Sequence, residues 1–488
     1  MTNSDIAIGK NKVKTIKLSK KAIIMAVAVV MILVVGAYTL TFVLPTGEYQ
    51  RDESGSIIQD TYHENPDLDG IKWWQFLLSP IMILSPTSEG FEVVYVIIAL
   101  LLVIGAVFAA LDDSDILTYM IEAIGSRFKE KKYYLIFILV FAFMFLGSAV
   151  GMFEELIPLV PIVVMLCYAM GWDALVGLGI SILAGCFGFA AGVVNPFTVG
   201  VAQTLGGLEL FSGIELRLLT FVFAYAILIA FIYPYAKMID KYPAKSSVYK
   251  LDLIRKKEFN FNIDTFKPHP QKGLALKWFA AWMCFIVLCS IVAIFWHTLA
   301  HYIMYIAVAV YIIAGVGASV ICGVRGKKLM RLFGKGMLSL MPAVAMILVA
   351  GGVRYIISEG DIMDTILYRA VTLIESQNPN TAILLIYLVI FVFEIFIPSG
   401  SAKAFLIMPI IFDLSSMVGI HPQTAVLAFA YADGFANVLL PTNAGLLLIL
   451  GLTTVNYPKW FKWSIPIQLT LLAVTIGILM LAQNVVYA

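Results

Sequence analysis

The sequence predicts an all-α polytopic membrane protein with two inverted-topology repeats, each containing a re-entrant helical hairpin and a broken transmembrane helix. Three observations predict this fold class. Of the 488 residues, 61% are hydrophobic and 13% are charged, whereas a soluble domain carries roughly 25% charged residues. Apolar runs of about 20 residues, the length that crosses a bilayer, recur along the whole chain. Interruptions of these runs fall at matched places in the two halves.

This composition also excludes several classes of protein. There is no room for a large soluble domain, and the net charge of +2 excludes an electrostatic nucleic-acid binder. The five cysteines lie in apolar stretches without CxxC spacing, so we expect them to pack in the core. The five histidines stand singly, so no metalloenzyme and no cofactor is expected. The classes of protein that the composition still allows are a channel, a transporter and a membrane-embedded enzyme.

The length of each apolar run and the residues that interrupt it indicate which kind of element it forms. They are expected at 21–44, 91–111, 132–148, 153–170, 174–195, 198–210, 214–236, 277–297, 301–323, 337–357, 381–397, 403–418, 422–440, 444–455 and 464–484. The run 21–44 is too long for the core of a signal peptide, which favours a first membrane helix. The spans within 132–170 and 381–418 are too short to cross, which predicts two re-entrant hairpins. The stretches 174–210 and 422–455 are helices broken at Asn195-Pro196 and Pro441-Thr442-Asn443.

The distribution of Lys and Arg predicts the orientation. Most basic residues lie at the N-terminus and in segments 127–132, 237–277 and 325–335, which should therefore be cytoplasmic, while the acidic loop 45–90 should face outward. The C-terminus is then outside. The expected division is 1–20, a cytoplasmic basic N-terminus; 21–90, the first helix and outer loop; 91–236, repeat 1; 237–276, a cytoplasmic linker; 277–336, connecting helices and a cytoplasmic loop; and 337–488, repeat 2.

The two halves match weakly at an offset near 248 residues. Pro161 and Gly171 correspond to Pro409 and Gly419, and Asp115-Ile116-Leu117 corresponds to Asp361-Ile362-Met363 at an offset of 246. Apolar helices resemble one another by chance, so the order of elements is the stronger observation. By the charge argument the two hairpins enter from opposite sides, an arrangement typical of secondary transporters.

Four interruptions combine helix breakers with small hydroxyl or amide side chains. They are Gly147-Ser148-Ala149-Val150-Gly151, Asn195-Pro196-Phe197-Thr198, Pro398-Ser399-Gly400-Ser401 and Pro441-Thr442-Asn443. Unpaired backbone groups at membrane depth are costly unless they line a cavity or bind something. Any one interruption alone is equally well read as an ordinary kink. Four in paired order predict a binding site where half-helix N-termini hold an anionic group and freed carbonyls hold a cation.

Charges inside apolar stretches add a second signal, because they are costly and usually functional. Glu154 and Glu155 follow the first tip, and the offset aligns Lys403 with Glu155. The acidic pair is also explained as the first turn of a helix, stabilised by its dipole. Further acids in apolar surroundings are Glu394, Asp413 and Asp433, against the bases Lys403 and Arg354. The acidic excess favours an amino acid, a cationic amine or proton coupling over a dianion.

These motifs resemble the YfcC family, relatives of the anaerobic C4-dicarboxylate carriers (DcuC-like) in the ion-transporter superfamily. The similarity runs from about residue 20 onward. It is carried by Gly151-Met152-Phe153-Glu154-Glu155, the string from Asn195 to Gln203, Ser399-Gly400-Ser401-Ala402-Lys403-Ala404, and Asp433-Gly434-Phe435-Ala436-Asn437 leading to Pro441-Thr442-Asn443. Ala402 stands where the family pattern has glycine, which leaves the flexibility of the second tip in doubt. The resemblance implies a scaffold plus a moving transport domain, a homodimer, and sodium sites near Ser148, Asn195, Ser399 and Asn443.

The helix interruptions, the charges inside apolar stretches and the family resemblance together predict the residues that bind the substrate. They are Ser148, Gly151, Glu154, Glu155, Asn195, Pro196, Thr198, Ser399, Gly400, Ser401, Lys403, Asp433, Asn437, Thr442 and Asn443. No catalytic residue is expected, because Ser399 or Ser401 with Lys403 lacks any accompanying hydrolase motif.

The expected function is secondary transport of a small amino acid or carboxylate across a bacterial inner membrane, coupled to Na⁺ or H⁺ or running as exchange. Family members include basic amino acid antiporters, and the acidic excess favours arginine or ornithine. A C4-dicarboxylate carrier with Lys403 and Arg354 as anion partners is the alternative, and a channel is a more distant one.

Overall fold

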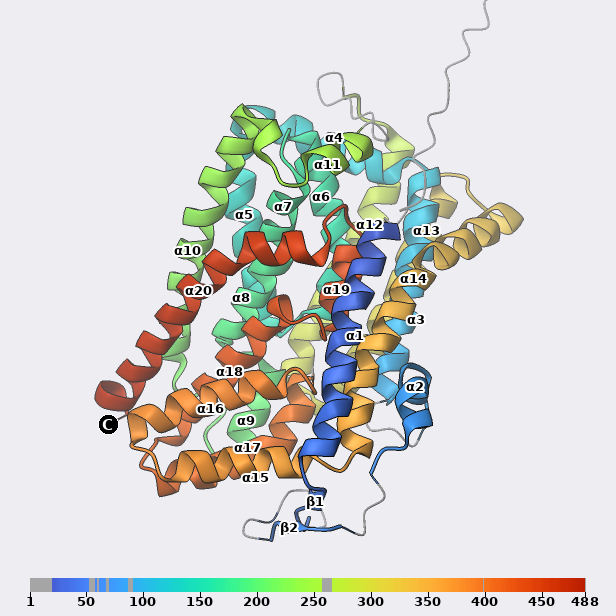
Figure 1. Ribbon diagram of the computed structural model, residues 1–488. Coiled ribbons are helices and arrows are strands. Elements are labelled where there is room, and N and C mark those ends of the chain that lie inside the picture. The colour runs from blue at the N-terminus through green and yellow to red at the C-terminus, as the bar shows by residue number, and fades with distance from the viewer. Residues whose placement is uncertain are drawn as a thin grey trace, which may run out of the picture.

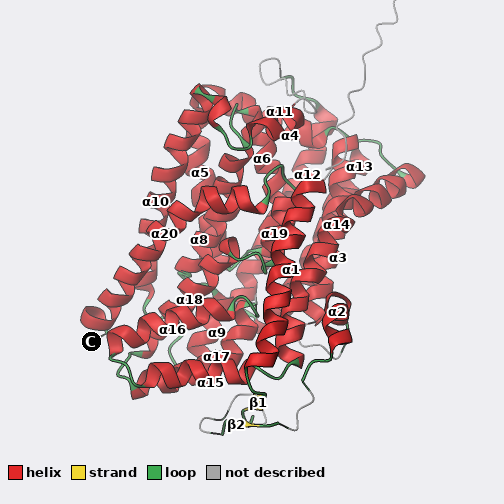
Figure 2. Cartoon of the chain, in the orientation of Figure 1, coloured by secondary structure: helices red, strands yellow, loops and turns green. Residues whose placement is uncertain are grey.

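The computed structural model describes residues 20–51, 58, 61–66, 70–86, 91–256, 266–397 and 399–487. Helices make up almost all of this part of the chain, together with one two-stranded ribbon (Figure 2). Within it, nine helical segments are long and apolar enough to cross a membrane, and the bent helix α14 brings the number to ten. The expected all-α polytopic fold class is therefore confirmed.

One group of helices comes from the N-terminal part and the middle of the chain. Its members are α1 (Lys20–Val43), α2 (Trp73–Met82), α3 (Phe91–Asp113), α12 (Pro270–Phe295), α13 (His297–Ile321) and α14 (Gly326–Glu359). Helix α14 packs along α1, α2 and α3, and α13 packs against α3 and α12. Gly105 of α3 and Gly336 of α14 allow the two backbones to lie against each other, because a side chain on either glycine would meet the other's carbonyl. This group lies on the right of Figure 1.

The second group contains the segments that the sequence predicts to form the hairpins and the broken helices. In the first half it consists of α4 (Ile116–Phe128), α5 (Lys132–Phe145), α6 (Val160–Ala169), α7 (Ala174–Leu178), α8 (Ala184–Ala191), α9 (Val201–Leu205) and α10 (Ile214–Lys241). In the second half it consists of α15 (Met363–Glu375), α16 (Pro379–Phe393), α17 (Gly400–Met417), α18 (Pro422–Leu439), α19 (Ala444–Gly451) and α20 (Tyr457–Leu481). Residues 174–192 of the candidate span Ala174–Leu205 are all buried, and α8 packs against α18, so the broken helices form the centre of this group.

The two halves of this group have the same order of elements. Asp115 before α4 and Asp361 before α15 both adopt left-handed backbone, with φ of 54° and 51°. Gly171 and Gly419, which follow the second hairpin arms, have φ of 89° and 72°. Helices α4 and α15 lie at opposite ends of the molecule (Figure 1). Positions matched in sequence therefore share backbone conformations that side chains rarely adopt.

Several elements differ from the expected ones. Helices α2, α4 and α15 and the eight-residue α11 (Tyr249–Lys256) were not predicted, because a search for long apolar runs misses short or half-polar helices. Helix α12 begins at Pro270, and α14 begins at Gly326, so the expected loop 325–335 is largely helical. The loop 45–90, which the charge distribution predicts to face outward, carries strands β1 (Gly47–Glu48) and β2 (His63–Glu64), which pair antiparallel.

The expected linker 237–276 is more than a solvated connector in its described part. Asp252 of α11 is buried and accepts hydrogen bonds from the Ala174 N–H at 2.9 Å, the Tyr168 hydroxyl at 2.9 Å and the Thr454 hydroxyl at 2.5 Å. Burial raises the pKa of the Asp252 carboxyl above its ordinary value. Ala174 and Tyr168 belong to the first half and Thr454 to the second. The linker therefore joins the two halves through one carboxylate.

We expect Asp252→Ala to lower the melting temperature of the purified protein. The change leaves the N–H of Ala174 without its acceptor at a buried helix start, which costs about 1–3 kcal/mol. Lys250→Ala, at an exposed position on the same helix, is the matched control. Equal melting of the two variants would contradict a joining role for Asp252.

Candidate functional site

The first hairpin tip is fixed to the first broken helix by Ser148. Helix α5 runs into the π-helical turn Leu146–Val150, in which Ser148 is buried. Its hydroxyl oxygen accepts the N–H of Val193 at 3.0 Å, and its carbonyl oxygen accepts the N–H of Val194 at 3.2 Å. Both donors lie in the break between α8 and α9. Ser148 thus satisfies backbone groups that the broken helix leaves unpaired.

Asn195 starts the second half of that broken helix. Its Oδ1 accepts the N–H groups of Phe197 at 3.0 Å and Thr198 at 3.4 Å, which is the usual action of asparagine as an N-cap. Pro196 occupies the first helical position, where no N–H is needed. The Asn195 Nδ2 atom is buried and has no hydrogen-bond partner in the described part of the structure.

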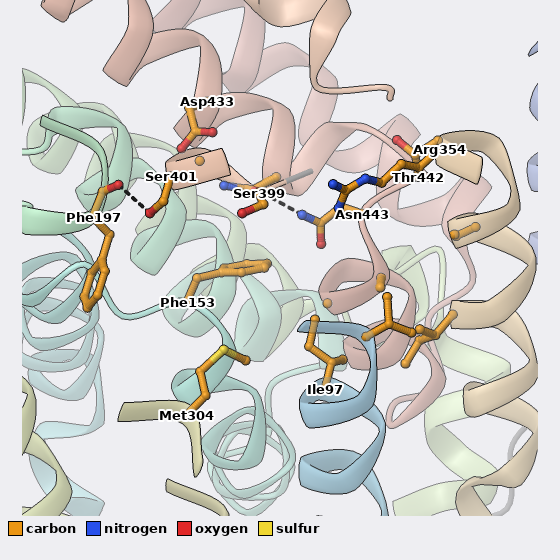
Figure 3. A pocket seen from close by; sticks show the side chains of 18 of the residues that line it. Ile97, Phe153, Phe197, Met304, Arg354, Ser399, Ser401, Asp433, Thr442 and Asn443 are labelled. Atoms are coloured by element: carbon orange, nitrogen blue, oxygen red, sulfur yellow. Dashed lines mark hydrogen bonds between the residues drawn. The ribbon is translucent and has the colours of Figure 1, made fainter. Parts of the chain in front are cut away.

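The second tip reaches across to the first broken helix. Ser399 precedes α17 without capping it through its side chain, and the Ser401 hydroxyl donates to the carbonyl oxygen of Phe197 at 2.8 Å (Figure 3). Pro398 lies outside the described residues. Because the Ser401 hydroxyl is directed at a backbone carbonyl, it does not form the Ser-Lys pair that a hydrolase would need.

Asn443 repeats the role of Asn195 at the equivalent position of the second half. Its Oδ1 accepts the N–H of Leu446 at 2.9 Å, and its Nδ2 donates to Oδ1 of Asn437 at 2.6 Å. The hydroxyl of Thr442 is buried and has no partner among the described residues. Both breaks therefore use an asparagine to start the second half-helix.

A cavity of about 310 Å³ lies where these tips and breaks meet. Ten of the expected binding residues line it: Gly151, Glu155, Thr198, Ser399, Gly400, Ser401, Asp433, Asn437, Thr442 and Asn443. Ser148, Asn195 and Pro196 do not line it and instead hold the backbone at the first tip and break. Lys403 also does not line it. The side chain of Glu154 lies outside the described part of the structure.

The cavity has one polar and one apolar wall. Ser399, Ser401, Thr442 and Asn443 lie along one side, whereas Phe153, Met304 and Ile97 lie along the other (Figure 3). The apolar wall includes residues of α3, α13 and α14. Sequence reasoning missed it, because an isoleucine or methionine that faces a cavity looks like one that faces lipid. Arg354, which the sequence indicated as an intramembrane base and as an anion partner in the dicarboxylate alternative, also lines the cavity.

The cavity combines two kinds of electrostatic feature. The helical segments that begin at Pro196, Gly400 and Ala444 start beside it, and helix N-termini carry partial positive charge. The carboxyl groups of Glu155 and Asp433 line the same space. Glu155 lies in the first turn of the 3₁₀ segment Glu154–Leu159, so it both begins a helix, as the alternative explanation holds, and faces the cavity. This arrangement suits a ligand with an anionic and a cationic end.

Lys403 belongs to a buried ion cluster behind the polar wall. Its Nζ contacts Oε2 of Glu394 and lies 2.6 Å from Oδ1 of Asp433. All three side chains are at most 1% exposed. Lys403 is therefore neutralised inside the protein in this structure. Asp413, which the sequence placed among the intramembrane acids, is exposed and takes no part.

A second cavity of about 420 Å³ shares Arg354 with the first. Its other walls come from the β1 region, from the end of α14, from the start of α15, and from Ile397 and Leu406. There Asp364 binds Arg51 at 3.1 Å and accepts the N–H of Tyr49 at 3.0 Å. Burial raises the pKa of Asp364 and, next to it, of Asp361. The outer loop is thus attached to the second half of the chain beside the inner cavity.

A polytopic helical protein that encloses a two-walled cavity between hairpin tips and broken helices has the architecture of a membrane transporter. Residues 24–484 match the family described as C4-dicarboxylate anaerobic carrier, DcuC. The chain therefore belongs to this family, as the motifs indicated.

Two curated proteins are similar to this chain in sequence. "Putative basic amino acid antiporter YfcC" of Escherichia coli (strain K12) is 28% identical over 404 residues, covering 80% of this chain and 76% of that protein. An uncharacterized protein of Haemophilus influenzae is 27% identical over 398 residues, with the same coverage.

Two solved transporter structures are similar in outline. MtrF of Neisseria gonorrhoeae, reported as one of a class of antimetabolite efflux pumps, covers 94% of this chain and 95% of its own at 15% identity, with a TM-score of 0.45. YdaH of Alcanivorax borkumensis, reported to have an unusual topology, covers 93% of this chain and 97% of its own at 15% identity, with a TM-score of 0.43. At these TM-scores neither supports a detailed comparison of the site.

We expect Gly151→Ala to destabilise the first tip. Gly151 has φ of 72°, and a Cβ there would strike Oδ1 of Asn195, the atom that caps the broken helix. Left-handed backbone alone costs an alanine about 1–2 kcal/mol. Gly477→Ala is the matched control, since it lies inside helix α20 with no atom near a new Cβ. Thermal unfolding should show a lower melting temperature for Gly151→Ala only; an unchanged value would contradict the close approach of Asn195.

Proposed function

We propose that this protein is a secondary active transporter of a bacterial inner membrane that carries a small amino acid, with a basic one such as arginine or ornithine as the first candidate and antiport as the mode. The observation that carries the proposal is the cavity in which helix N-termini and two carboxyl groups face one space. A C4-dicarboxylate is the second candidate.

The cavity suits the two ends of a basic amino acid. The N-termini of α17 and α19 favour the α-carboxylate, with Ser399, Thr198 and Asn443 supplying hydroxyl and amide groups. Glu155 and Asp433 favour the cationic end. The volume of about 310 Å³ is at the small end of the range for ligand pockets, which fits a metabolite of this size.

The two walls suggest how access alternates. The polar wall comes from the hairpin tips and broken helices, while the apolar wall comes largely from the group around α3, α13 and α14. We propose that the hairpin group is the transport domain of two inverted repeats, which moves as a unit past the apolar surface of a scaffold in a homodimer. In this proposal the N-terminus is cytoplasmic and the C-terminus outside, as the distribution of basic residues predicts.

The proposal allows either of the two coupling ions expected from the sequence, Na⁺ or H⁺. Sodium sites would use Ser148, Asn195, Ser399 and Asn443. The side-chain oxygens of Ser148, Asn195 and Asn443 already accept backbone N–H groups, so a sodium ion would have to share them. A proton requires only a carboxyl group, and the site offers several.

The dicarboxylate alternative is favoured by Arg354, a cationic side chain on the cavity wall. It would use helix N-termini for one carboxylate and Arg354 for the other. Lys403, the other anion partner expected from the sequence, is bound to two carboxyl groups instead.

We expect Glu155→Gln to reduce arginine uptake into proteoliposomes about tenfold or more. Removal of a buried charged partner costs about 1.5–3 kcal/mol, and 1.4 kcal/mol is a factor of ten in affinity. Asp413→Asn, which removes an exposed acid from α17, should transport as the unchanged protein does. Arginine uptake that is unaffected by Glu155→Gln would refute the role of Glu155.

The two substrate classes are separated by Arg354→Gln and by competition. If the substrate is a basic amino acid, unlabelled arginine or ornithine blocks uptake and succinate does not, and Arg354→Gln does not abolish transport. Block by succinate but not arginine, with transport lost in Arg354→Gln, would establish the dicarboxylate carrier instead. Measurable conductance in a planar bilayer would point to a channel.

A further inference from the structure

The buried ion cluster contains one more acidic group than basic groups. Lys403 in the first turn of α17 is held by Glu394 at the end of α16 and by Asp433 in the middle of α18. One ammonium neutralises one carboxylate. A second ionised carboxylate would leave a net negative charge on side chains that are at most 1% exposed, and such a charge is strongly disfavoured unless it gains a proton or a cation.

The surroundings of the cluster do not supply a second cation. The ring of Phe429 lies 5.9 Å from Nζ of Lys403, and Gly400 lies beside the carboxyl group of Asp433. The cavity that Asp433 lines also contains Glu155 and Arg354. In the described part of the structure, neither of them forms a hydrogen bond or an ion pair with Lys403, Glu394 or Asp433. The buried tyrosines of the adjoining helices bond elsewhere, Tyr387 with Thr475 and Tyr431 with Thr220.

Two oxygens of the cluster remain without partners. Oε1 of Glu394 and Oδ2 of Asp433 are buried and have no hydrogen bond within the described structure. Asp433 also lines the cavity, whereas Glu394 is fully buried behind it. The cluster therefore has one carboxyl group that a ligand can reach and one that it cannot.

We propose that the Lys403–Glu394–Asp433 cluster holds a single proton when the cavity contains no cationic substrate, and releases it when such a substrate pairs with Asp433. This inference rests on the proposed transport of a cationic amino acid and names its coupling ion. On binding, the carboxylic O–H bond in the cluster breaks, the proton passes to water in the cavity, and the substrate cation takes its place beside the carboxylate.

The exchange balances charge at the site. The protonated cluster is neutral, because one ammonium faces one carboxylate and one carboxylic acid. The deprotonated cluster carries one negative charge, which the substrate cation neutralises. The site is thus neutral whether a proton or a substrate occupies it, and the species of high energy is the one with neither. Such competition for one negative charge is sufficient to couple two opposite fluxes.

The proton itself is tested without substrate by infrared spectroscopy of the purified full-length protein. The C=O stretch of a carboxylic acid, which shifts in deuterated buffer, should be present at neutral pH. Because the proton belongs to the pair of acids, Glu394→Gln and Asp433→Asn should each remove the same band. Glu155→Gln and Asp413→Asn should keep it. A band absent from the unchanged protein, or present in both cluster variants, would overturn the inference.

Coupling is tested by adding arginine to the weakly buffered protein with a pH indicator. We expect one proton to be released for each arginine bound, and none from a variant, Glu394→Gln or Asp433→Asn, that still folds and binds. Binding without release in the unchanged protein would refute the coupling while leaving the proposed substrate intact. Absence of arginine binding would refute the substrate, and the infrared band would still decide whether the cluster holds a proton. Two variants on different helices keep the test decisive if one of them fails to fold.

Discussion

The structure depends on one constraint, the need to satisfy backbone N–H and C=O groups wherever a helix stops inside the apolar body of the protein. Both broken helices meet it in the same way, with an asparagine that caps the second half-helix. Asn195 and Asn443 stand 248 residues apart and accept N–H groups from the residues that follow them. The hairpin tips complete the pairing, since Ser148 accepts two N–H groups from the first break. The cavity exists because these stops converge, and the helix N-termini beside it follow from the same geometry.

A second rule governs buried charge in this protein, namely that an ionisable group is tolerated next to an opposite charge or next to several hydrogen-bond donors. Lys403 is surrounded by Glu394 and Asp433, and Asp252 gathers three donors at the linker. The second case is balanced by hydrogen bonds and joins two halves of the chain. The first is unbalanced by one charge and borders the cavity. A purely structural cluster has no reason to carry this excess, which is why the difference between the two points to transport.

Much of the fold and part of the site could be predicted from the sequence. Breakers such as Pro196 and small polar residues such as Ser399 stand out against an apolar background, so the interruptions and ten lining residues were identified. Phe153 and Met304 were not, since nothing in their sequence neighbourhood distinguishes a cavity wall from a lipid contact. Lys403 was read as an anion partner because its acids are 9 and 30 residues away along the chain. Only the packing of α16, α17 and α18 brings them together.

The two hairpin tips are tied down unequally. The first is held by the backbone and hydroxyl oxygens of Ser148, and Gly147 lies against the backbone of α8 so closely that no side chain fits between them. Among the described residues of the second tip, the bond across to the first broken helix is the one from Ser401 to Phe197. Separating the described part of the second tip from the first broken helix would break this side-chain bond, whereas separating the first tip would unpair backbone groups as well. We therefore expect the side of the cavity formed by the second tip to open more readily than the side formed by the first.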